Sequence, residues 1–137
     1  MELSFVGRER ELEQLESCYR NASDERGAVA IVVGEPGVGK SRLIREFTSA
    51  VQLGSVLTVA AHEVTESPLR LWRSVATSAD RKLGVPEEGT RFVFGANEGP
   101  SADMADIADR MLTLLLDLPA PVVLVIEDLQ WADTASR

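Results

Sequence analysis

Four residues in the first third of the chain, Gly34, Gly39, Lys40 and Ser41, match the pattern G-x-x-x-x-G-K-[ST]. Phosphate oxygens need several converging backbone N–H donors, and glycines permit the close approach and the backbone angles of such a loop. The lysine would reach the β- and γ-phosphates, and the serine hydroxyl would bind Mg²⁺. The alternative is a chance match in a Gly-rich turn, expected on the order of once in a few hundred chains of this length. The pattern therefore predicts a phosphate-binding loop over residues 34–41.

A second pair of reactive side chains, Glu127 and Asp128, directly follows the apolar run at residues 122–126. Acids at the carboxyl end of a buried parallel strand lie at the sheet edge where α/β proteins bind ligands. One carboxylate there can hold Mg²⁺ through its water shell, and its neighbour can orient or deprotonate an attacking water. Taken alone, the pair is more readily an ordinary acidic turn. Together with the upstream loop, it predicts two catalytic, metal-associated acids.

The flanking segments predict the elements that position these residues. Continuous apolar and β-branched runs predict strands over 28–33, 55–61 and 122–126. Apolar residues at helical spacing predict helices over 7–21, 40–52, 68–83 and 101–115, the second stopped by Gly54 and the last capped by Ser101. Residues 84–100, rich in Gly, Pro and Glu, predict an irregular connection. Strands that alternate with helices indicate an α/β fold with a parallel sheet.

Composition restricts the class of protein. The 137 residues, 45% hydrophobic and 26% charged, are typical of one soluble globular domain. A formal net charge of −8 argues against direct nucleic-acid binding by this segment. The single Cys18 and single His62 exclude an intrachain disulfide and a multi-histidine metal site. Because no signal peptide and no apolar run near the ~20 residues of a bilayer span is present, we expect a cytoplasmic protein without membrane contact.

Four segments stand in a characteristic order: FVGRERELEQL, GEPGVGKSRLIREF, ESPLRLW and VVLVIEDLQWAD. They resemble the AAA-type ATPase module of STAND signalling proteins, and are most similar to the ATPase domains of large ATP-binding LuxR-type transcriptional regulators. The resemblance spans nearly the whole chain. It implies a three-layer P-loop NTPase with a mostly parallel sheet, here incomplete, with Walker A at 34–41 and Walker B at 122–128. It also implies ATP and Mg²⁺ as cofactors, ADP as a second nucleotide, and either self-association or further domains of a larger regulator as partners.

The resemblance assigns roles to single residues. The VGR turn, Val6, Gly7 and Arg8, lies against the adenine in the family, although from composition alone it is equally a plain helix start. Glu127 takes the Mg²⁺-associated position and Asp128 the water-activating one. Most AAA-type proteins have the reverse order of acids, so the individual roles stay open. The complete nucleotide-binding set adds to the VGR turn Gly34, Glu35, Pro36, Gly37, Val38, Gly39, Lys40, Ser41 and Arg42, and the metal set is Ser41, Glu127 and Asp128.

In the family, further strands follow the paired acids, and one lies between the Walker A and Walker B strands. Without that neighbour, buried backbone groups would stay unpaired at about 1–3 kcal/mol each, against a total stability of about 5–15 kcal/mol. Either 28–33 and 122–126 pair directly, or the chain is marginally stable by itself. We therefore expect residues 1–137 to be the N-terminal portion of a single P-loop ATPase domain.

Three functions follow from these features. The first is an ATP-binding switch module of a signalling or transcription regulator. The second is an autonomous ATPase, for which the acids are present but no arginine finger, worth roughly 10³–10⁵ in rate, is recognised. The third is a non-enzymatic, marginally folded remnant. Hydrolysis by this chain alone stays open.

Overall fold

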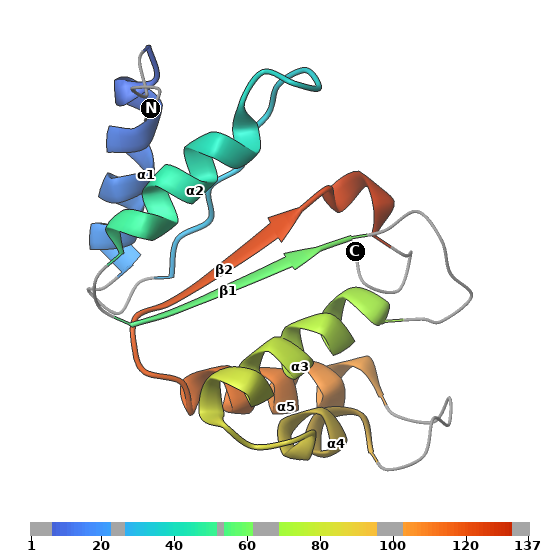
Figure 1. The fold of residues 1–137 in the computed structure, drawn as a ribbon. Coiled ribbons are helices and arrows are strands. Elements are labelled where there is room, and N and C mark those ends of the chain that lie inside the picture. Colours follow the sequence, from blue (N-terminus) through green and yellow to red (C-terminus); the bar gives the residue numbers. More distant parts are fainter. Residues whose placement is uncertain (1–6, 23–26, 52–53, 62–68, 96–102, 133–137) are drawn as a thin grey trace. The chain divides into compact units, whose positions relative to one another are not determined.

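The computed structural model of the chain describes residues 7–22, 27–51, 54–61, 69–95 and 103–132 (Figure 1). By its internal contacts the chain forms two compact units, residues 1–53 and 54–137. The glycine-rich loop belongs to the first unit and the paired acids belong to the second.

The first unit is built on two packed helices, α1 (Glu9–Ala22) and α2 (Lys40–Ala50). Leu15 of α1 and Leu43 and Phe47 of α2 are buried. The Tyr19 ring meets the Phe47 ring edge-on, with the centroids 6.2 Å apart. Both helices were predicted from their apolar periodicity and are confirmed. Helix α2 ends at Ala50, with Val51 as its C-cap, so the prediction that Gly54 stops this helix is wrong.

The apolar segment 28–33 differs most from its prediction. It forms no strand, and Val29, Ile31 and Val33 are 80–89% exposed. A strand needs a neighbour to pair its N–H and C=O groups, and the two strands of the described sheet pair with each other. In the described sheet 122–126 pairs with β1 (Ser55–Ala60), and 28–33 is not one of its strands.

The second unit contains that sheet. Strands β1 (Ser55–Ala60) and β2 (Val122–Glu127) are parallel, with Ser55 opposite Val122 and Ala60 opposite Glu127. Residues 55, 57 and 59 are buried, so one face of β1 is turned to the core. The predicted strands 55–61 and 122–126 are confirmed, and with them the α/β class with a parallel sheet.

Three helices of the second unit lie on one side of the sheet: α3 (Arg70–Leu83), α4 (Glu88–Phe94) and α5 (Met104–Leu116) (Figure 1). Helix α3 packs against β1, and α4 and α5 pack against α3 and each other. The largest fully buried side chains of this unit are Leu57, Val75 and Val93. The predicted N-cap of the last helix, Ser101, lies outside the described residues. The described cap is Asp103, whose carboxylate accepts from the Ala105 amide at 3.2 Å.

Helix α4 corrects the prediction of an irregular connection over 84–100. Its first turn is held by Asp80 of α3, which is 3% exposed. The Asp80 carboxylate accepts from the Gly89 amide at 2.7 Å, and from the amide and hydroxyl of Thr90 at 3.0 and 2.7 Å. A Cβ on Gly89 would lie 2.5 Å from both Asp80 Oδ1 and Leu114 Cδ1, so this close packing requires glycine.

Candidate functional site

Residues 34–41, here called the glycine loop, connect the extended segment 27–33 to α2. The backbone turns at Pro36-Gly37, and the Val38 amide donates to the Glu35 carbonyl at 3.3 Å. Gly37 and Gly39 have φ angles of 79° and 95°, which side chains disfavour. A Cβ on Gly34 would come within 2.9 Å of the Val38 side chain. The loop therefore needs glycine at the positions that the phosphate-loop pattern specifies.

Lys40 begins α2 and folds back onto the loop. Its Nζ donates to the Gly34 carbonyl at 2.8 Å and to the Glu35 carbonyl at 3.0 Å. These bonds hold a positive charge against the backbone of the glycine loop. Ser41 and Arg42 follow in the first turn of α2, both exposed.

The start of α2 is suited to an anion. Its N-cap, Gly39, supplies no side-chain cap, and no acidic residue lies in the first turn. The first amides of a helix have no intrahelical acceptor, and the helix macrodipole adds partial positive charge there. A negatively charged group would therefore be stabilised at this end of α2 by backbone amides and Lys40 together.

The turn that precedes α1 reaches the glycine loop. Arg8 Nη2 donates to the Val38 carbonyl at 2.9 Å, across 30 positions of sequence. Gly7 has a φ of 91°, and its amide donates to both carboxylate oxygens of Glu9, at 3.0 and 3.1 Å. This bond lowers the pKa of Glu9 below its ordinary value, because it stabilises the carboxylate. Sequence reasoning selected Gly7 and Arg8 but missed Glu9; Val6 lies outside the described residues.

The paired acids stand where β2 ends, as predicted. Glu127 is the last residue of the strand and is half-buried, and its carbonyl accepts from the Ala61 amide at 3.0 Å. Asp128 is exposed, has a φ of 54°, and caps the 3-10 helix η1 (Leu129–Trp131). Neither carboxylate has a side-chain partner among the described residues, so both are available to a ligand. Since the acids and the loop belong to different units, their sharing of one metal stays a prediction.

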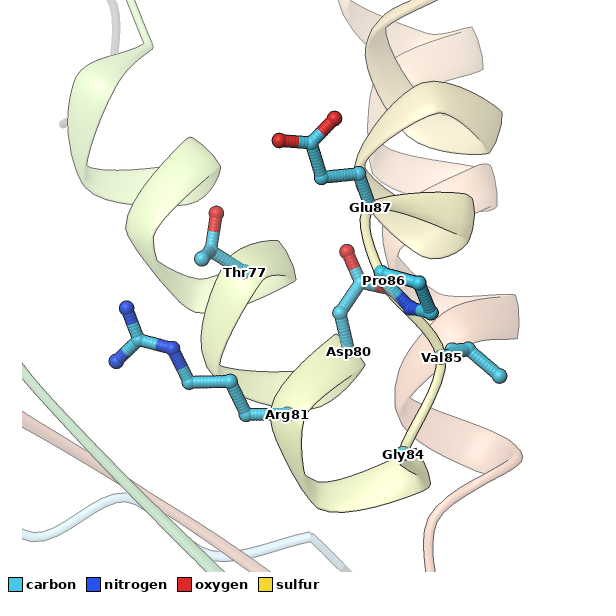
Figure 2. A pocket seen from close by; sticks show the side chains of 7 residues that line it. All are labelled: Thr77, Asp80, Arg81, Gly84, Val85, Pro86 and Glu87. Carbon is cyan, nitrogen blue, oxygen red and sulfur yellow. The ribbon is translucent and has the colours of Figure 1, made fainter.

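A cavity of about 360 Å³ lies at the junction of α3 and α4 (Figure 2). Its lining consists of Thr77, Asp80, Arg81, Gly84, Val85, Pro86 and Glu87. Figure 2 labels Asp80 among the side chains that line the cavity, and its carboxylate accepts from the amides at the start of α4. None of the predicted site residues lines the cavity, and its buried carboxylate is already used structurally. The cavity therefore lies where α3 and α4 pack together and is not part of the predicted site.

The described residues contain no group of three or more His, Cys, Asp or Glu side chains arranged to hold a metal ion. None of the helices in this part of the chain has the length and apolar character needed to cross a bilayer.

A family model described as "AAA ATPase domain" matches residues 4–137, which is nearly the whole chain. No curated protein and no solved structure matches significantly. The match includes the glycine loop and the paired acids.

Proposed function

The chain belongs to the AAA ATPase domain family, and from that premise we propose that it is the Mg²⁺·ATP-binding module of a STAND-type signalling or transcription regulator. The family makes it a nucleotide-binding P-loop module. The observation that carries the proposal is the geometry of the glycine loop, in which two left-handed glycines and Lys40 surround the start of a helix.

The loop supplies the chemistry that a polyphosphate needs. Backbone amides of residues 34–41 and of the first turn of α2 would donate to phosphate oxygens. Lys40 would exchange the carbonyls of Gly34 and Glu35 for β- and γ-phosphate oxygens, because a hydrogen bond between two charged groups is stronger than one to a neutral carbonyl. Glu35, Pro36, Gly37 and Val38 would shape the loop, and Arg42 would lie near the phosphates.

The available oxygen donors suit Mg²⁺, which prefers hydroxyl and carboxylate ligands. Ser41 is exposed beside Lys40, and neither Glu127 nor Asp128 has a side-chain partner among the described residues. Glu127 would hold the metal through its water shell, and Asp128 would orient the attacking water. The bound ion would neutralise charge on the phosphates.

Two finer elements of the proposal come from the resemblance to STAND proteins. Val6, Gly7 and Arg8 would lie near the adenine. The nucleotide state would switch conformation or assembly within a larger cytoplasmic regulator. Hydrolysis is the second candidate function, and the observation that favours it is the pair of carboxylates at the end of β2.

The test is a thermal melt of the purified chain during titration with ATP and Mg²⁺. Ligand at 100 times its Kd stabilises by about 2.7 kcal/mol, which raises Tm by on the order of 10 °C in a chain of this size. We expect this shift in the wild type and its loss in Lys40→Ala. The matched control is Lys82→Ala, which removes the chain's other lysine. An unshifted wild type, or a full shift in Lys40→Ala, contradicts the proposal.

A further inference from the structure

We propose that Arg8 is a positioning residue for the glycine loop, which acts by holding the Val38 carbonyl and not by contacting the base. The inference rests on the proposed function, because it takes the glycine loop as the phosphate site. It departs from the role near adenine that the resemblance implies.

Arg8 is hydrogen-bonded to the peptide between Val38 and Gly39. Its Nη2 lies 2.9 Å from the carbonyl oxygen of Val38. That carbonyl shares a planar peptide unit with the amide of Gly39, and the two groups of a trans peptide point in opposite directions. Fixing the carbonyl toward Arg8 therefore directs the Gly39 N–H away from Arg8.

This peptide needs an external hold. Rotation of the peptide between Val38 and Gly39 changes ψ of Val38 and φ of Gly39, and glycine populates positive and negative φ with similar ease. Gly39 therefore makes a second orientation of this peptide accessible. Gly39 is the N-cap of α2, and its N–H donates to no backbone carbonyl among the described residues. Arg8 selects the orientation in which this donor is presented at the helix start.

Arg8 is itself held in place. Its carbonyl accepts the first bond of α1 from the Leu12 amide at 3.1 Å, and the preceding Gly7 amide is bound by Glu9. Helix α1 packs on α2, the helix that the glycine loop precedes. The separation of Arg8 from Val38 is therefore fixed by the packing of two helices, as a positioning role requires.

The test compares Arg8→Ala with Arg10→Ala in the full chain. Both variants remove one positive charge, and Arg10 is an exposed residue of the same helix start. The electrostatic potential at an anionic ligand therefore changes in both variants. The hydrogen bond to the Val38 carbonyl is lost only in Arg8→Ala.

Two ligands separate the possible roles of Arg8: Mg²⁺·ATP and Mg²⁺·tripolyphosphate, which has no base. If the competent loop falls to a tenth or a fifth of the population, apparent Kd rises by about five- to tenfold. We expect Arg8→Ala to weaken both ligands by the same factor and Arg10→Ala to change each by less than about twofold. Weakening of ATP alone would place Arg8 at the base and overturn the inference, as would equal effects of the two variants.

A ligand-free measurement keeps the inference testable if the proposed function fails. In the amide NMR spectrum of the nucleotide-free chain, Arg8→Ala should broaden or split the Gly39 resonance, because two peptide orientations become populated. The Gly39 signal of Arg10→Ala should match the wild type. If neither ligand binds the wild type, the proposed function fails, and the Gly39 signal still decides the role of Arg8. An unchanged Gly39 resonance in Arg8→Ala overturns the inference in either case.

Discussion

Lys40 illustrates how a single residue connects the fold to the proposed chemistry. Its ammonium group has three donors, and two are bonded to the carbonyls of Gly34 and Glu35. The Lys40 ammonium is therefore bonded to two neutral backbone carbonyls of the glycine loop. A phosphate that binds here would compete with these carbonyls for the Lys40 donors. This competition favours the phosphate, since charged pairs form the stronger hydrogen bond.

Glu9 provides a pH test of the turn that carries Arg8. The Gly7 amide stabilises the Glu9 carboxylate and lowers its pKa below the ordinary 4.5. A carboxylate with a lowered pKa contributes stability above its unfolded pKa and loses it as pH falls through the folded value. We expect the Gly7 amide shift in NMR to titrate with a midpoint below 4.5.

The control for that titration is Glu9→Gln, which keeps the shape of the side chain and removes the ionisable group. The Gly7 shift should then be flat over the same pH range. A midpoint at or above the ordinary value would show that the hydrogen bond from Gly7 does not stabilise the charged form.

At the scale of elements, Asp80 joins α3 to α4 and gives a stability prediction. Asp80→Ala removes three hydrogen bonds to a buried carboxylate and leaves the amides of Gly89 and Thr90 without it. Loss of a cap costs about 0.5–2 kcal/mol, and hydrogen bonds to charged groups contribute about 1.5–3 kcal/mol each. We expect the free energy of unfolding in urea to fall by about 2–3 kcal/mol.

The matched control is Asp109→Ala, since Asp109 is an exposed acid on α5 whose carboxylate has no partner among the described residues. Its effect should stay within about 0.5 kcal/mol. Equal effects of the two substitutions would mean that Asp80 does not stabilise α4.

An element can be predicted from the sequence when the interactions that form it lie within its own segment. The periodic helices α1, α2, α3 and α5 follow from their own sequences, and so does the local geometry of the glycine loop. Helix α4 has only 7 residues and is capped by a carboxylate from another helix, so its own segment gives little signal. The contact of Arg8 with Val38 spans 30 positions and has no sequence pattern of its own.

At the scale of the whole molecule, the prediction that Ser41 and Glu127 bind the same Mg²⁺ comes from the resemblance to STAND proteins. Glu127→Gln tests this, because it keeps the side-chain shape and removes the charge that Mg²⁺ requires. We expect Mg²⁺·ATP to bind about tenfold more weakly, as for the loss of a group that acts through the water shell, while Mg²⁺-free ATP binding changes little.

The control is Glu88→Gln, an exposed acid in the same unit with the same change in charge. Isothermal titration with and without Mg²⁺ measures both variants. If Glu127→Gln keeps the full Mg²⁺ dependence, the acids do not share the metal of the glycine loop.

The exposed segment 27–33 predicts which apolar side chains belong to the hydrophobic core and which do not. A continuous apolar run predicts burial, because pattern reasoning assumes that the run has neighbours on both sides. Burial also needs a paired strand, and 28–33 has none in the described sheet. Ile31, 80% exposed, should therefore tolerate Ile31→Ala within about 0.5 kcal/mol. Leu43 of the same unit is 1% exposed, and Leu43→Ala should cost about 2–5 kcal/mol. Urea unfolding of both variants measures this difference in stability. Comparable losses of stability would mean that segment 28–33 is part of the hydrophobic core.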